Sequence, residues 1–160
     1  MSLVYLILGG NQGNRAEIIS RAIDLVTSEI GPKITSSASY ESESWGFKSE
    51  PFINQIIIIS TILSPTEVLS RTQQIEIRLG RIRETNGYEA RPIDIDLLYY
   101  DSLVLNSKNL TLPHPRIASR KFVLMPLAEI TPGFRDPSTQ LTILEMLERC
   151  KDTAYVKRLS

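Results

Sequence analysis

The 160-residue sequence has one cysteine, one histidine, no excess of either charge and no long apolar run. Cys150 alone cannot form an internal disulfide, which fits a reducing compartment. Thiol catalysis is disfavoured because only His114 could activate the thiol. Lys plus Arg and Asp plus Glu number 18 each, and this balance argues against nucleic-acid binding by bulk electrostatics.

Segments that would target the chain or anchor it in a membrane are also missing. The apolar run at 3–8 is too short for a signal sequence and has no basic flank. The longest apolar block, 56–59, is far below the length that spans a bilayer. We expect a soluble, cytoplasmic protein with no membrane partner and no nucleic-acid partner.

The usual phosphate-binding loops are absent from the sequence. No G-x-x-x-x-G-K-[ST] motif occurs, and "GGNQGN" at 9–14 does not fit G-x-G-x-x-G. This stretch is typical of a turn between a strand and a helix. If phosphate is bound, its charge would have to be neutralised by metal and arginine rather than by backbone amides.

Strands and helices alternate along the rest of the sequence. Helix starts are indicated by Asn14 with Glu17 and by Ser64 with Glu67, and helix ends by Gly31 and Gly80. The predicted order is strand 3–8, helix 14–30, strand 33–41, loop 42–51, strand 52–63, helix 64–79, loop 81–91, strand 92–100, a hairpin through 103–105 and 110–112, one or two helices after Pro115, and a helix near 140–150.

This order predicts the fold class α+β. The β-α-β-β-α-β core is ferredoxin-like, with an antiparallel sheet and helices on one face, extended by an extra hairpin and C-terminal helices. No repeat or linker divides the sequence, so residues 1–160 are expected to form a single domain. Because this fold serves many functions, function has to be inferred from a site.

Two carboxylates interrupt the apolar strand in "YEARPIDIDLLYYD", residues 88–101. On a strand, Asp94 and Asp96 point to the same face, about 7 Å apart, and the intervening apolar residues point into the core. Two hard oxygen ligands without a neighbouring Cys or His suit Mg²⁺ better than zinc. The alternative is a pair of aspartates on a solvated sheet face that pair with basic residues.

Basic residues surround this strand in the sequence. Arg81, Arg83 and Arg91 precede it, and Arg116, Arg120 and Lys121 follow His114. The planar guanidinium group matches phosphate oxygens. Each arginine alone reads as a solvated charge, but around two aspartates the group indicates phosphoryl transfer from a nucleotide.

Aromatic residues could form a pocket for a planar ligand. Trp45 and Phe47 lie in the 42–51 loop, and Phe52 and Asn54 begin the next strand. With Phe122, they could hold a planar ring whose polar edge Asn54 would bind. Taken singly, Phe52 and Phe122 are more typical of the core.

Four stretches together resemble one known family. They are "LILGGNQGN", "TQQIEIRLGRIR" (72–83), "RPIDIDLLYYD" and "LTLPHPRIASRKFVLMPLAEI" (110–130), and they resemble the 6-hydroxymethyl-7,8-dihydropterin pyrophosphokinases. The resemblance implies transfer of the β,γ-diphosphate of ATP to the hydroxymethyl group of the pterin, which leaves AMP, in folate synthesis. It also implies two Mg²⁺ ions, ATP as co-substrate, and a monomer.

The resemblance assigns roles to individual residues of this sequence. The catalytic residues would be Arg81, Arg91, Asp94 and Asp96, the last two holding the metal. The ATP-binding residues would be Gln73, Arg81, Arg91, Leu97 by its backbone, Thr111, His114 and Arg120. The pterin-binding residues would be Asn11, Ser42, Trp45, Phe52, Asn54, Tyr88 and Phe122. The sequence departs from the family pattern at Tyr88, at Glu89-Ala90 and at Asn109.

Two other classes of protein remain as alternatives. A different Mg²⁺-dependent nucleotidyl or phosphoryl transferase would share the aspartates but release pyrophosphate or ADP. A non-catalytic ferredoxin-like module would need no metal, but an RNA-binding module is disfavoured by the neutral charge.

Overall fold

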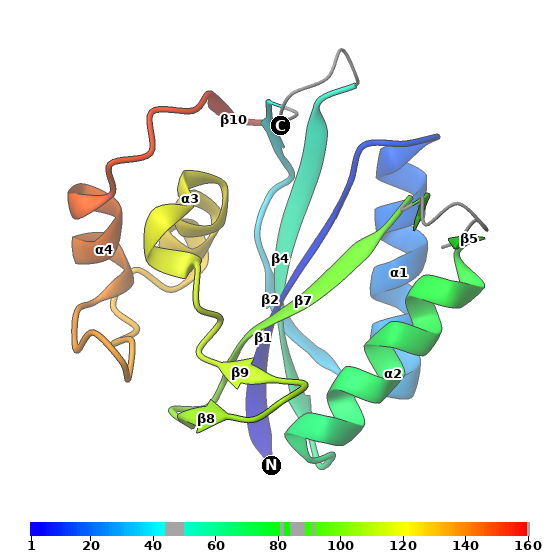
Figure 1. Cartoon of the computed structure of the whole chain (residues 1–160), viewed down its shortest axis with the longest axis horizontal. Coiled ribbons are helices and arrows are strands. Elements are labelled where there is room, and N and C mark those ends of the chain that lie inside the picture. The colour runs from blue at the N-terminus through cyan, green and yellow to red at the C-terminus, as the bar shows by residue number, and fades with distance from the viewer. Residues whose placement is uncertain (44–49, 81, 84–88, 91, 160) are drawn as a thin grey trace.

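The structure is a computed structural model, and it describes residues 1–43, 50–80, 82–83, 89–90 and 92–159. A central antiparallel sheet runs through the molecule in the order β10-β3-β4-β1-β7, and β2 also pairs with β4 (Figure 1). Its strands are β1 (Ser2–Gly10), β2 (Lys33–Ser36), β3 (Tyr40–Ser42), β4 (Phe52–Thr61), β7 (Asp94–Tyr100) and β10 (Val156–Arg158).

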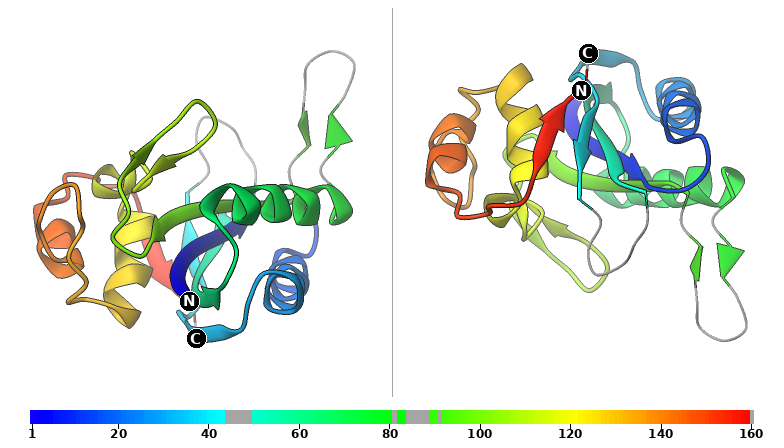
Figure 2. Two further views of the ribbon diagram at one scale, coloured as in Figure 1. Left: turned by 90° about the horizontal axis from the view of Figure 1, so that it is seen from below. Right: turned by 90° about the horizontal axis from the view of Figure 1, so that it is seen from above.

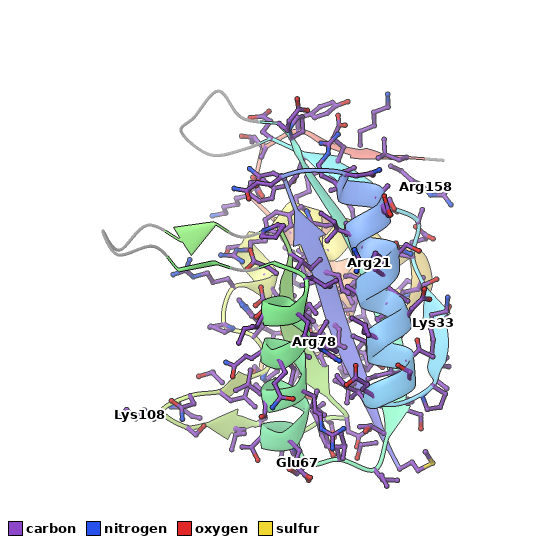
Figure 3. The ribbon with its side chains drawn as sticks, turned by 90° about the vertical axis from the view of Figure 1, so that its right-hand side faces the viewer. Arg21, Lys33, Glu67, Arg78, Lys108 and Arg158 are labelled. Atoms are coloured by element: carbon purple, nitrogen blue, oxygen red, sulfur yellow. The ribbon has the colours of Figure 1, made fainter. Side chains whose placement is uncertain are left out.

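Two long helices, α1 (Arg15–Glu29) and α2 (Pro65–Arg78), lie side by side on one face of this sheet (Figures 1 and 3). Both start as predicted. The Asn14 side chain accepts a hydrogen bond from the Glu17 amide, and Ser64 and Glu67 form a reciprocal capping box. The stretch at 9–14 is therefore the end of β1 and the turn into α1, and the ferredoxin-like α+β core is confirmed.

The opposite face of the sheet is covered as well. A short 3₁₀ helix η1 (Ile117–Ser119), α3 (Lys121–Ile130) and α4 (Ile143–Arg149) pack there around a second apolar core (Figure 1). Tyr99 anchors this side, because its ring contacts Tyr5 and Phe134 and its hydroxyl donates to Asp136 Oδ2 at 2.6 Å. The predicted C-terminal helices therefore form a third layer, and the sheet lies between two helical layers.

The strand expected at 33–41 is divided in two. Between β2 and β3, the Ser37 amide donates to the Ile56 carbonyl at 2.8 Å, and the Ser37 hydroxyl accepts from the Ile56 amide at 2.9 Å. The side chain thus satisfies the β4 backbone where the ladder is interrupted. β3 continues the sheet outward and carries β10 on its other edge.

Within the part of the chain that the structure describes, two short two-stranded sheets complete the fold. The predicted hairpin is present as β8 (Leu105–Asn106) and β9 (Thr111–Leu112). β5 (Ile82–Arg83) pairs with β6 (Glu89–Ala90), and both project away from the body of the molecule (Figure 2). Among the described residues, no helix has the length and apolar character needed to cross a membrane.

Candidate active site

The two aspartates lie on β7, which is an edge strand of the main sheet. Asp94 is half-buried and Asp96 is exposed, whereas Ile93, Ile95 and Leu97 are buried in the core beneath α1 and α2. The alternation places both carboxylates on the face that also carries η1 and α3, as the spacing predicts. The strand thus fixes two acidic groups at the margin of the second core.

Gly9 of β1 lies between Asp94 of the acidic strand and the buried side-chain amide of Asn54. In the sheet register Gly9 of β1 lies opposite Asp94 on one side and Asn54 on the other. A Cβ atom on Gly9 would lie 2.0 Å from Asn54 Oδ1. Only a residue without a side chain lets the Asn54 amide lie over β1, in line with Asp94.

The acidic strand and this amide line one cleft of about 970 Å³. Its volume is at the upper end of the range for small-molecule sites, about 300–1,000 Å³. It brings together eight of the residues that the resemblance assigns to substrates or metal: Ser42, Phe52, Asn54, Asp94, Asp96, His114, Arg120 and Phe122.

A smaller hollow of about 290 Å³ adjoins the cleft on the side of the β8–β9 hairpin. Leu97 and Thr111, both predicted to bind ATP, line this hollow, and so does Asn109. Asp96 and His114 line both spaces. The acidic strand therefore borders both cavities.

His114 lies between the two cavities with a defined proton position. Its Nδ1 accepts a hydrogen bond from the Arg116 amide at 3.1 Å, so the proton of the neutral ring is on Nε2. Burial lowers the pKa of His114; Asp96 opposes this effect, while Arg120 and Arg116 add to it. The ring is thus neutral at neutral pH and can donate one hydrogen bond.

Arg120 places a guanidinium in the cleft at the start of α3. Its Cζ lies 5.5 Å from the centroid of the Phe122 ring, in a cation–π contact. Burial and the neighbouring Arg116 lower the pKa of Arg120, and Asp96 raises it. Arginine stays charged despite such effects, so Arg120 supplies a fixed cation near Asp96.

Two further predicted residues lie outside both cavities. Asn11 lies in the turn after β1 and Gln73 is exposed on α2; neither lines the two cavities. The predictions for Arg81, Arg91, Trp45 and Tyr88 fall outside the described residues, and their roles stay predictions.

Several residues of the cleft were not predicted from the sequence. Glu43 follows β3, and Arg149, Lys151 and Asp152 come from the end of α4 and the segment after it. These residues have no periodicity or spacing that would mark them as part of a site. Only the folded chain brings them near Asp94.

Asp94 and Asp96 are the candidate ligands for magnesium. Within the described ranges, no group of three or more His, Cys, Asp or Glu side chains could hold a metal ion. Mg²⁺, however, is commonly bound by one or two carboxylates, with water and substrate phosphates completing its coordination. Two aspartates lining a cleft large enough for a nucleotide phosphate fit that requirement.

Comparison with known proteins assigns this architecture to a family. Residues 5–132 match the model of the 7,8-dihydro-6-hydroxymethylpterin-pyrophosphokinase (HPPK) family. The chain belongs to the HPPK family. The match covers both cavities except for the C-terminal segment that lines the larger one.

Curated HPPK relatives extend over most of the chain. The 2-amino-4-hydroxy-6-hydroxymethyldihydropteridine pyrophosphokinase of Porphyromonas gingivalis is 42% identical over 136 residues, which cover 82% of this chain and 92% of that protein. The enzyme of the same name from Bacillus subtilis is 37% identical over 131 residues, 81% of this chain and 78% of that protein.

Solved structures show the same fold at low sequence identity. The wild-type HPPK-DHPS of Plasmodium falciparum matches with a TM-score of 0.76 and 15% identity, over 92% of this chain. This chain corresponds to only 44% of that longer chain. At this identity the likeness shows the fold alone.

Proposed function

We propose that this chain transfers the β,γ-diphosphate of ATP to the hydroxymethyl group of 6-hydroxymethyl-7,8-dihydropterin, giving the pterin diphosphate and AMP in folate synthesis. We further propose that the reaction depends on Mg²⁺ held by Asp94 and Asp96. The observation that carries the proposal is the cleft, in which the two aspartates share one space with Asn54, Phe52 and Phe122 in a chain of the HPPK family.

The pterin would occupy the side of the cleft formed by β3, β4 and the start of α3. Phe52 and Phe122 are half-buried and line the cleft there, so their rings can contact a planar heterocycle. Asn54 and Ser42 are buried, with 7% and 6% of their surface exposed. Their side chains can pair with the polar edge of the heterocycle, which fixes its orientation.

The nucleotide would extend from Asp96 toward the hollow beside β8 and β9. The Leu97 side chain is packed in the core, so any contact with the nucleotide there falls to its backbone. Thr111 is exposed on β9 and offers a hydroxyl. His114 can donate its Nε2 proton to a phosphate oxygen, and Arg120 offers two parallel N–H groups to another.

The protein's own part in the transfer is positioning and charge stabilisation. Asp94 and Asp96 would bind two Mg²⁺ ions, which when bound neutralise charge on the triphosphate and on the departing AMP oxygen. Arg81 and Arg91 are proposed to add positive charge at the phosphates. One chain provides the whole described cleft, so we expect a monomer; this and a cytoplasmic location stay predictions.

The test compares Asp96→Asn with a matched control, Asp24→Asn, which removes an exposed carboxylate from α1. Wild type and control should form AMP and pterin diphosphate in equal amounts when given ATP, Mg²⁺ and the pterin. Asp96→Asn should be slower by at least about 100-fold, since a bound metal contributes several kcal/mol to such a transition state.

Other outcomes would contradict the proposal in different ways. Formation of ADP or inorganic pyrophosphate would indicate another transferase with the same acidic strand. Full activity of Asp96→Asn would mean that this carboxylate does not take part in the reaction.

A further inference from the structure

The C-terminal segment after α4 forms one wall of the substrate cleft. Arg149 is the last residue of α4, and Lys151 and Asp152 follow it; all three line the cleft. The segment then continues past α3 to β10 (Figure 1). It lies beyond residue 132, where the match to the family model ends.

Asp152 ties this wall to the start of α3. Its Oδ2 accepts a hydrogen bond from the Lys121 amide at 3.0 Å, and its Oδ1 accepts one from the Ala154 amide at 2.9 Å. Lys121 is the first residue of α3, and the preceding Arg120 makes no side-chain capping bond. Asp152 therefore acts as a distant cap for the helix that carries Phe122.

The bonded amides also keep Asp152 ionised. The amides of Ala154 and Lys121 hold the pKa of Asp152 below its usual range, and the nearby Lys121 charge acts in the same direction. Burial raises the pKa of Asp152, but by less than the two amides lower it.

The other side of the segment is fastened to β3. The Tyr155 amide donates to Glu43 Oε1 at 3.2 Å, and Val156 of β10 pairs with Ser42 of β3. The segment is thus fixed both to the strand that carries Ser42 and to the helix that carries Phe122. These two residues belong to the side of the cleft assigned to the pterin.

On this wall the carboxylates have hydrogen-bond partners, whereas the cations form no salt bridge with the described residues. The carboxylates of Asp152 and Glu43 already accept backbone N–H groups. Within the described part of the chain, neither Arg149 nor Lys151 forms a salt bridge, although Glu145 lies within the electrostatic reach of Arg149. Both cations are exposed and available to an anion in the cleft.

We propose that Arg149 and Lys151 form a subsite for the diphosphate group of the pterin product, and that Asp152 holds them in place. The inference rests on the proposed function. The pterin substrate has no anionic group, whereas its product carries a multiply charged diphosphate. Cations beside the ring therefore bind the product in preference to the substrate, which delays its release.

The test measures equilibrium binding of 6-hydroxymethyl-7,8-dihydropterin and of its diphosphate by calorimetry. The variant is Arg149→Ala/Lys151→Ala, and the matched control is Arg21→Ala/Lys157→Ala. The control removes the same formal charge from exposed positions on α1 and β10, outside the cleft. Arg21 lies on the outward-facing helix in Figure 3.

The double variant should bind the product about tenfold more weakly at low salt, because it loses two charge-assisted contacts. Substrate binding should change by less than about twofold, and the difference should shrink as salt screens the charges. The control should match wild type for both ligands. Equal effects on substrate and product, including no effect on either, would overturn the subsite.

A second pair of variants tests the role of Asp152. Asp152→Asn keeps one of the two acceptor oxygens, which can still accept from the Lys121 amide, and should retain part of the product preference. Asp152→Ala removes both oxygens and should lose it. Equal preference in the two variants would refute the positioning role. A wild-type chain that makes no pterin diphosphate would instead refute the proposed function itself.

Discussion

Gly10 is a position where one added methyl group should directly disturb the strand that carries Asp94 and Asp96. A Cβ atom there would lie 2.2 Å from the Pro92 carbonyl oxygen and 3.1 Å from its carbonyl carbon. Both are backbone atoms, so no rotamer change can relieve the overlap. Pro92 and the fully buried Ile93 lead directly into Asp94.

The size of the effect follows from this distance. An ordinary carbon–oxygen contact is more than 3 Å, so in Gly10→Ala the two backbones must separate by about 1 Å. A displacement of about 1 Å in a catalytic group can cost roughly 100-fold in rate. Overpacking of this kind also costs about 1–3 kcal/mol of stability.

The assay compares Gly10→Ala with Gly133→Ala, because a Cβ on Gly133 meets nothing within 4 Å. The expected result is a fall of about 100-fold in kcat/KM for Gly10→Ala, with a lower melting temperature. Gly133→Ala should match wild type in both measurements. Wild-type kcat/KM and stability in Gly10→Ala would mean that the two backbones can separate without displacing Asp94.

Three other perturbations test separate parts of the molecule. Burial and the hydrogen bond to Glu129 raise the pKa of Tyr40 to about 12. Tyr40 therefore ionises at lower pH in the unfolded chain than in the folded one, and the free energy of unfolding should fall by about 2–3 kcal/mol as pH rises from about 10 to about 12. In denaturant titrations, Tyr40→Phe should lose less stability over this range. An equal loss in Tyr40→Phe and wild type would show that Tyr40 is not the cause. Ser64→Ala removes the Ser64 half of the α2 capping box. It should lower the free energy of unfolding by about 1 kcal/mol without altering kcat. An unchanged denaturation midpoint would contradict the role of the cap. Removing metal with EDTA should abolish turnover while circular dichroism stays unchanged, and excess Mg²⁺ should restore it; turnover that survives EDTA would contradict magnesium dependence.

The sequence predicts the structure best where local chemistry determines it. The capping residues Asn14 and Ser64 fixed the starts of both long helices, because a cap acts on amides only three residues away. The alternation around Asp94 and Asp96 placed both on one sheet face. These features depend on short spacings that are visible in the sequence.

The C-terminal part could not be placed in the same way. The third layer depends on Tyr99 meeting Asp136, and the wall of the cleft depends on Asp152 meeting Lys121. Those partners lie 37 and 31 residues apart, so no local pattern links them. The interruption between β2 and β3 likewise follows from the contact of Ser37 with Ile56 on another strand.

Transfer of a diphosphate group from ATP can be followed with labelled phosphorus. ATP labelled separately at the α, β or γ position would be incubated with the chain, Mg²⁺ and 6-hydroxymethyl-7,8-dihydropterin, and the products separated. We predict that the β and γ labels both appear in the pterin product and that the α label appears in AMP. Transfer of the γ label alone, with the β label left in ADP, would contradict the proposed reaction.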